Sequence, residues 1–289
     1  MNYLMHLLIM LCFYAMLGQS LNLLVGYGGL LSLSHAALYG LGAYAAALLS
    51  ANCGIPFILA LPACVVAAMM VSAIVALPSL RLKGDFFVLA TLGFQMIACA
   101  IALNWVGMTN GPYGITGIVR PTLFGLAFTS LPSFLGLVAV LTAIVLFVQM
   151  RIARSPFCRT LQAVRDDEIA AASLGKNTLF FKVAAFMMAG GVAALVGALY
   201  GVYVSFIDPT SFTIDESIFI LSIVIIGGAG NVVGPFVGAL VMVLLPEALR
   251  FARIPDSLAP NVRQIALGLL LIVLMRFRPQ GIAGNYEFD

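Results

Sequence analysis

The first 80 residues, Met1 to Leu80, read MNYLMHLLIMLCFYAMLGQSLNLLVGYGGLLSLSHAALYGLGAYAAALLSANCGIPFILALPACVVAAMMVSAIVALPSL and contain no Asp, Glu, Lys or Arg. A helix needs about 20 apolar residues to cross a bilayer, so this stretch has room for three crossings. Such long uncharged runs are expected only where lipid is the solvent and the backbone pairs its own polar groups. The opening stretch therefore predicts a chain embedded in a membrane.

The rest of the 289-residue chain repeats this pattern. Its residues are 63% hydrophobic and only 9% charged, whereas a soluble domain is about half apolar and about a quarter charged. Further runs without charge lie at 86–119, 121–150, 183–207 and 217–246. The composition excludes a soluble enzyme, a disordered regulator and a nucleic-acid-binding protein, because the net charge of +3 comes from short basic clusters beside apolar runs.

We expect an all-α polytopic membrane protein that forms a single transmembrane domain over residues 1–289, with about eight or nine transmembrane helices, some broken by glycine. The predicted helices lie near 4–25, 30–50, 55–78, 86–105, 131–150, 183–204, 217–227, 232–249 and 262–277. Whether 217–249 crosses the membrane once or twice is open. We favour two crossings, because Gly227 to Asn231 interrupts a stretch that is too long for one helix.

Lys and Arg indicate the orientation, because cytoplasmic loops carry an excess of both. Six of the fourteen basic residues lie in the segment 151–182, namely Arg151, Arg154, Arg159, Arg165, Lys176 and Lys182. This segment is therefore predicted to be cytoplasmic. Counting crossings from it places Arg81 and Lys83 in the cytoplasm as well, and it places the N-terminus outside. The loops 106–130 and 205–216, which contain only Arg120 as a base, then also lie outside.

The cytoplasmic segment contains the sequence RDDEIAAASLGK, from Arg165 to Lys176. Its three consecutive acids suit a helix N-terminus, where the helix dipole favours negative charge. Gly175 follows the last apolar residue, as expected at a helix end. Two interpretations stay open: a solvated loop that only helps to fix orientation, or a short coupling helix on which a cytoplasmic partner docks.

Polar residues are rare in the predicted spans, and several lie close to glycine-rich breaks at Gly26–Gly29 and Gly227–Gly230. A polar group in a membrane must be paired or line a cavity, and glycine-broken segments in two halves of a transporter point to a substrate path. The candidates for a translocation path are Asn22, Gly26, Gly28, Ser34, His35, Thr91 and Gln95. Interhelical hydrogen bonding is the alternative. We expect no metal site, because the five cysteines form no C-x-x-C pair and His35 has only His6 as a possible partner.

Several motifs resemble those of branched-chain amino acid permeases of ABC importers. The stretch Glu168-Ile169-Ala170-Ala171, with Gly175 after it, resembles the coupling loop of ABC importer permeases. Four further stretches are similar to this family, namely LNLLVGYGGLLSLSHA at 21–36, ATLG at 90–93, GITG at 114–117 and RPQG at 278–281. The resemblance therefore covers nearly the whole chain.

Another motif, Arg81-Leu82-Lys83-Gly84-Asp85, resembles the LivM-type subunit rather than its LivH-type sister. It could form a specific contact with partner subunits. The alternative is that Arg81 and Lys83 are only the signal for a cytoplasmic loop, and that Asp85 caps a helix that begins at Phe86.

The resemblance implies that the chain forms half of a heterodimeric pore with a LivH-type permease in a bacterial inner membrane. It implies two cytoplasmic ATPase subunits, and a periplasmic binding protein that delivers substrate from outside. The implied ATPase-coupling residues are Arg165, Asp166, Asp167, Glu168, Ile169, Ala170, Ala171 and Gly175. No G-x-x-x-x-G-K-[ST] motif occurs, so we expect the partners to bind ATP and the chain to have no cofactor and no enzymatic activity.

The implied substrate is a branched-chain or related hydrophobic amino acid, and urea or short amides stay open. An ion-coupled secondary transporter is disfavoured, because it usually keeps a carboxylate within the membrane and every acid here lies at a span end or in a loop. An intramembrane enzyme would need clustered acids or histidines. The one acidic cluster, 166–168, suits a helix start better.

Overall fold

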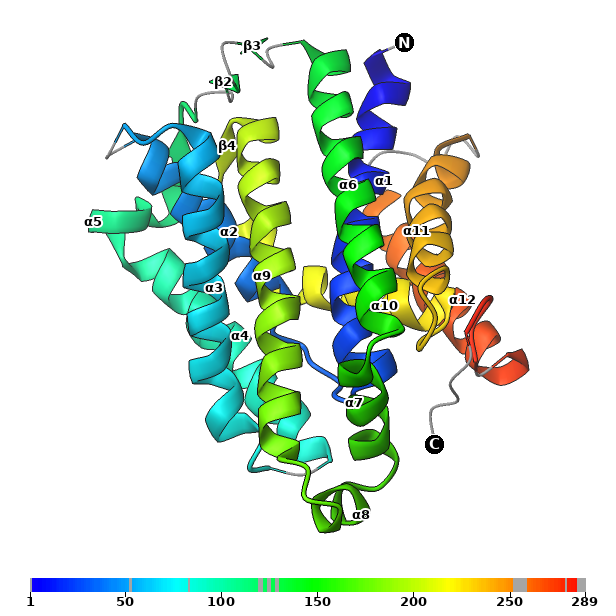
Figure 1. The fold of residues 1–289 in the computed structure, drawn as a ribbon. Coiled ribbons are helices and arrows are strands. Elements are labelled where there is room, and N and C mark those ends of the chain that lie inside the picture. The colour runs from blue at the N-terminus through cyan, green and yellow to red at the C-terminus, as the bar shows by residue number, and fades with distance from the viewer. Residues whose placement is uncertain are drawn as a thin grey trace.

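The computed structural model shows a bundle of helices (Figure 1). It describes residues 2–51, 54–82, 84–118, 122–123, 126–127, 130–251, 259–278 and 280–284. Three basic residues that bear on the predicted orientation, Lys83, Arg120 and Arg253, lie outside these ranges.

Long helices make up most of the bundle, namely α1 (Asn2–Asn22), α2 (His35–Ala51), α3 (Phe57–Ser79), α4 (Asp85–Asn104), α6 (Leu131–Ala153), α9 (Thr178–Val204), α10 (Ile214–Gly227), α11 (Gly234–Phe251) and α12 (Ala259–Phe277). A π-helical turn, η1 (Leu23–Tyr27), continues α1. Two short helices, α7 (Pro156–Asp166) and α8 (Glu168–Ser173), connect α6 to α9 at one end of the bundle (Figure 1).

The remaining elements are short. They are α5 (Val106–Thr109), the 3-10 turns η2 (Gly111–Tyr113) and η3 (Pro209–Phe212), and the strands β1 (Ile115–Thr116), β2 (Thr122–Leu123), β3 (Leu126–Ala127) and β4 (Phe206–Ile207). Strand β1 pairs antiparallel with β4, with Ile115 opposite Ile207, and β2 pairs with β3. The first pairing joins the loop before α6 to the loop after α9.

The expected class is confirmed by five described helical segments that are long and apolar enough to cross a membrane. They are Tyr3–Tyr27, Phe57–Ser79, Asp85–Asn104, Leu131–Ala153 and Thr178–Val204. The 17 residues of α2 fall short of the 20 or so that a crossing needs, because α2 begins at His35 rather than near residue 30. The number of eight or nine crossings stays a prediction.

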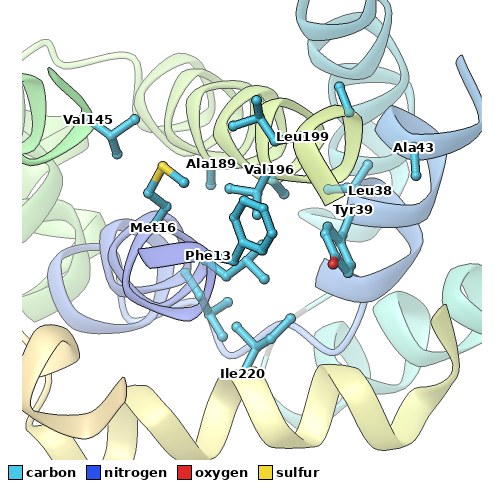
Figure 2. Packing of buried hydrophobic residues seen from close by; sticks show 14 of the residues in the cluster. Phe13, Met16, Leu38, Tyr39, Ala43, Val145, Ala189, Val196, Leu199 and Ile220 are labelled. Atoms are coloured by element: carbon cyan, nitrogen blue, oxygen red, sulfur yellow. The ribbon is translucent and has the colours of Figure 1, made fainter. Parts of the chain in front are cut away.

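The helix α10 differs from the two-crossing arrangement that we favoured for 217–249. Its 14 residues span only about 21 Å, and it lies crosswise to the long helices near the middle of the bundle (Figures 1 and 2). The helix α11 runs alongside α1 instead (Figure 1). The structure therefore gives no second full-length crossing by α10, and the double crossing is not confirmed.

The segments predicted to lie on opposite sides of the membrane can be compared with the two ends of the bundle. Figure 1 places the α3–α4 turn, to which Arg81 belongs, at the same end of the bundle as α8. This is the end at which α7 and α8 of the basic segment 151–182 lie. The N-terminus and the β-strands lie at the other end (Figure 1). Within the described residues, the segments predicted to be cytoplasmic thus lie at one end, and of those predicted to lie outside the N-terminus and the strands lie at the other.

The core is built on close contact between α2 and α9. A Cβ atom on Gly42 of α2 would overlap the backbone of Ala194, and one on Gly197 of α9 would overlap the carbonyl oxygen of Tyr39. Small residues matter here because van der Waals packing, rather than the hydrophobic effect, holds helices together in lipid. Figure 2 shows side chains of α1, α2, α9 and α10 meeting beside this contact, among them Phe13, Tyr39, Val196 and Ile220.

Candidate functional site

The predicted short helix at the basic end is α8. The Oδ1 atom of Asp167 accepts hydrogen bonds from the backbone amides of Ile169 and Ala170, both at 2.9 Å, so Asp167 is its N-cap. Gly175 follows the helix with a φ of +77°, in the left-handed region that favours glycine. The acidic start and the glycine end are thus confirmed, with one correction. Asp166 is the last residue of α7, because Asp167 has an extended backbone that separates the two helices.

The helix α8 is attached to α9 and exposes an apolar surface. The Nζ atom of Lys182 lies 2.8 Å from Oε2 of Glu168, and the side chain of Ala171 is buried. Ile169 and Leu174 are each 80% exposed. These two side chains, one in α8 and one at its C-cap, are the exposed apolar pair of this helix.

Arg165 contacts the first glycine-rich break. Its Nη1 atom donates a hydrogen bond to the carbonyl oxygen of Gly26 at 2.7 Å, and its Nε atom donates to Oδ1 of Asp166 at 2.8 Å. Gly29 has a φ of +64°, and a Cβ atom there would come within 2.5 Å of Cγ of Arg165. The sequence placed Arg165 and Gly26 in different candidate sites, and the structure brings them together.

The two glycine-rich breaks contact each other, and we call Gly26–Gly29 together with 228–233 the glycine junction. The Oδ1 atom of Asn22 accepts from the backbone amide of Gly230 at 3.0 Å, and its Nδ2 atom donates to the carbonyl oxygen of Asn231 at 2.9 Å. A Cβ atom on Gly26 would overlap the backbone nitrogen of Gly230. Asn22 and Gly26 therefore join the first helix to the loop between α10 and α11, and Gly28 lies buried in the turn after η1.

Gly281, the last residue of the RPQG motif, and the two residues after it lie against the same junction. The backbone amides of Ile282 and Ala283 donate to the carbonyl oxygens of Ile226 and Gly227, at 3.0 and 2.9 Å. Gly281 has a φ of +77°, and a Cβ atom there would come within 2.6 Å of Cα of Gly228. Sequence reasoning identified this motif but missed its partner, although the glycines on both sides indicate a close backbone approach.

The remaining path candidates surround the start of α2. The backbone amides of Leu33, Ala36 and Ala37 donate to Thr91 Oγ1, Ser217 Oγ and Gln95 Oε1, at 3.1, 3.0 and 2.7 Å. The first amides of a helix have no partner within it, and in a membrane protein they must find one elsewhere. Thr91 and Gln95 of α4 and Ser217 of α10 meet this need. Sequence reasoning missed Ser217, because a lone serine at the start of an apolar run has no distinguishing pattern.

His35 belongs to the same cluster. Its Nε2 atom lies 2.6 Å from Oγ of Ser20, whose hydroxyl donates to the carbonyl oxygen of Leu17 at 2.8 Å. The histidine is therefore the donor to Ser20. Ser34, whose hydroxyl lies 2.9 Å from that of Ser32, is buried with it. The bond between His35 and Ser20 joins α2 to α1, which is the interhelical hydrogen bonding given as the alternative, whereas Ser34 bonds locally to Ser32. A role in the translocation path stays a prediction for all seven candidates.

The motif at the α3–α4 turn is exposed. Arg81 and Asp85 both lie at the surface, and Gly84 has a φ of +56°. The prediction that Asp85 caps a helix beginning at Phe86 is wrong, because α4 begins at Asp85 and its N-cap is Gly84. Asp85 instead lies in the first turn, where the helix dipole favours an acid. Contact between this motif and a partner subunit stays a prediction.

No group of three or more His, Cys, Asp or Glu side chains that could hold a metal ion occurs within the described ranges. The chemistry that this part of the chain offers is that of helix ends, buried hydrogen bonds and exposed apolar surfaces.

A family model described as the permease component of the branched-chain amino acid transport system matches residues 3–275. The chain belongs to this family. The high-affinity branched-chain amino acid transport system permease protein LivM of Escherichia coli (strain K12) is 36% identical over an aligned length of 292, and the alignment covers 93% of this chain and 67% of the relative. The predicted resemblance to LivM-type permeases is confirmed.

More distant relatives share the permease description. A probable branched-chain amino acid transport permease protein LivM of Methanocaldococcus jannaschii is 26% identical over 228 residues, covering 74% of this chain and 64% of the relative. The autoinducer 2 import system permease protein LsrC of Salmonella typhi is 31% identical over 176 residues, covering 58% of this chain and 48% of the relative. No solved structure matches the chain significantly. The family is one of transport permeases, so the chain has a transport role.

Proposed function

We propose that this permease is the membrane-spanning subunit of an ATP-driven importer for branched-chain amino acids in a bacterial inner membrane. The observation that carries the proposal is the family match over residues 3–275, joined to an anchored helix, α8, with an exposed apolar pair. A LivH-type permease completes the pore, and a periplasmic binding protein delivers the substrate. Two ATPase subunits bind and hydrolyse ATP on the cytoplasmic side.

The anchoring of α8 explains how force from an ATPase enters the permease. Glu168 holds α8 against α9 through its ion pair with Lys182, and the side chain of Ala171 is buried. Helix α9 in turn packs against α2 with glycines at the contact, so the two helices move as one body. A displacement of α8 therefore reaches the membrane-embedded core without crossing a flexible linker.

A double variant tests the role of α8. Glu168→Ala removes the anchor to Lys182, and Gly175→Val places a β-branched residue at a φ of +77°. In a reconstituted complex with its ATPases and binding protein, ATP hydrolysis is expected to continue while uptake of labelled leucine is lost. The chain is expected to remain in the membrane, because the substituted residues lie outside the spans.

The matched control is Glu247→Gln with Gly136→Ala. Glu247 lies on α11, and Gly136 lies on α6 with open space around its Cβ position. This control is expected to transport at the unmodified rate. Unchanged uptake in the Glu168 and Gly175 variant would contradict the assignment of α8 as the coupling helix.

A further inference from the structure

The first membrane helix ends in a set of carbonyl groups that need partners. The carbonyl oxygen of Leu24 accepts from the amides of Gly28 and Leu30, at 3.1 and 2.9 Å, and that of Val25 accepts from Gly29 at 3.2 Å. The carbonyl oxygen of Gly26 accepts instead from Arg165, which is 139 residues away in the sequence. A helix C-terminus carries partial negative charge, so a guanidinium is a favourable cap there.

The surroundings of Arg165 orient its side chain toward this helix end. Both Nε and Nη2 lie 2.8 Å from Oδ1 of Asp166, and the side chain of Arg165 is only 15% exposed. The stem of the arginine passes over Gly29, where a Cβ atom would lie 2.5 Å from Cγ and 3.3 Å from Cδ. A residue other than glycine at position 29 would therefore displace the arginine from its contact.

The capped helix end is also the centre of the glycine junction. Gly26 touches Gly230. Asn22, which lies one turn before Gly26 in the first helix, bonds to Gly230 and Asn231. Arg165 lies on α7, two residues before Asp167, the N-cap of α8. A single side chain thus connects the segment that carries the exposed apolar pair with the place where both broken segments meet.

We infer that Arg165 is a positioning residue that transmits displacement of α7 and α8 to the glycine junction. The inference rests on the proposed function, since it presupposes that an ATPase acts on α8. The bond to Gly26 is short, directional and largely shielded from water, so α7 cannot shift without moving the end of η1 or breaking this bond. Arg165 acts on the permease itself, in contrast to the docking role that the resemblance implied for it.

Two variants break this contact in different ways. Arg165→Gln removes the cation. Gly29→Ala keeps the arginine but adds a methyl group in the space that its stem fills. In proteoliposomes that contain the full complex, both are expected to keep hydrolysing ATP, while leucine transported per ATP falls about tenfold, within the usual range of a coupling free energy. Arg165→Lys is expected to retain an intermediate ratio, because an ammonium group can still donate to the carbonyl oxygen of Gly26.

Two controls match these variants. Arg159→Gln removes an exposed arginine from the same helix, α7. Gly54→Ala imposes the same kind of backbone strain as Gly29→Ala, since Gly54 has a φ of +62°, but its Cβ position is open. Both controls are expected to keep the unmodified ratio of transport to hydrolysis.

Three outcomes decide the inference. Loss of transport per ATP in Arg165→Gln and Gly29→Ala, with both controls intact, supports it. An unchanged ratio in either variant overturns it, as does a parallel fall of hydrolysis and uptake that follows the amount of assembled complex, because that result describes a purely structural cap. Absence of ATP-driven uptake in the unmodified complex would instead contradict the proposed function.

Discussion

The side-chain Oδ1 atom of Asn22 accepts a hydrogen bond from the backbone amide of Gly230, at 3.0 Å and across 208 residues of sequence. The Nδ2 atom of the same residue donates to the carbonyl oxygen of Asn231. One buried amide side chain therefore satisfies two backbone groups of the loop between α10 and α11. The first helix and this loop are consequently one structural unit.

Replacement of Asn22 tests this unit. Asn22→Leu leaves the amide of Gly230 and the carbonyl of Asn231 without these partners, which is expected to lower the free energy of unfolding by about 1–3 kcal/mol. The measurement is a denaturant titration of the purified permease in detergent. The control is Asn104→Leu, since Asn104 is exposed and its side chain donates within its own helix, to the carbonyl oxygen of Ala100, at 2.8 Å. A loss of stability as large in the control as in Asn22→Leu would contradict this account.

The close contact between α2 and α9 is expected to make the stability of the fold sensitive to added volume at Gly197. Gly197→Ala places a methyl group against the carbonyl oxygen of Tyr39, so overpacking is expected to cost about 1–3 kcal/mol of stability. Gly136→Ala, with open space at its Cβ position, is expected to be neutral or to stabilise by up to about 1 kcal/mol, because alanine favours helix. Thermal unfolding midpoints in detergent compare the two. Equal midpoints would show that the two helices can separate freely.

Asp208, in the loop between α9 and α10, is expected to make the stability of the fold depend on pH. Burial opposes its ionisation, but hydrogen bonds from Ser211 and Thr210 outweigh that effect and hold its pKa below the ordinary value. A lowered pKa in the folded state stabilises the fold above the ordinary pKa of about 4, and this contribution is lost as pH falls through the folded value. Asp208 also caps η3 through the amide of Ser211, at 2.9 Å.

Asp208→Ala is therefore expected to lower stability by about 1 kcal/mol at pH 7, the typical value of an N-cap. The difference from the unmodified chain should shrink as pH falls below about 4 and through the lowered pKa of the folded state, because the carboxyl group is protonated first in the unfolded chain and then in the folded one. Thermal midpoints of both chains, measured from pH 7 to pH 3, give the comparison. A gap that stays constant over this range would rule out an ionised Asp208 as the source of the stability.

Burial of the Cys158 thiol on α7 is expected to slow its reaction with thiol reagents. Burial raises the pKa of this thiol to about 11, although the charge of Arg165 acts in the opposite direction. In a chain whose other cysteines are replaced by alanine, a maleimide is expected to modify Cys158 about 100-fold more slowly at pH 7 than an exposed cysteine, since only the thiolate reacts. The reference is Ser173→Cys on the exposed end of α8, in a chain that also carries Cys158→Ala. Comparable rates would contradict the packing of α7.

The sequence predicted the parts of the fold that local pattern controls. Long uncharged runs gave most spans to within a few residues, and the position of Gly175 gave the end of α8. The errors lie where a single backbone conformation decides. Asp166 and Asp85 were misplaced because an extended residue at Asp167 and a left-handed Gly84 set those helix starts, and an acid-rich pattern does not distinguish neighbouring positions.

Long-range pairing could not be predicted from one sequence. In a chain that is apolar on nearly every face, periodicity does not separate lipid contacts from helix contacts, so the crosswise course of α10 left no signal. A polar residue in a span indicates that a partner is needed, but it does not indicate which residue the partner is. The contacts of Asn22 with Gly230, and of Arg165 with Gly26, join segments that no local pattern relates.

Uptake in a defined system is the most direct test of whether this permease belongs to an ATP-driven importer. Proteoliposomes that contain the permease, a LivH-type permease and two ATPase subunits are given binding protein and labelled leucine outside and ATP inside. The account predicts uptake that requires both ATP and binding protein and that persists when ionophores collapse ion gradients. Uptake driven by a proton or sodium gradient in the absence of ATP would contradict it.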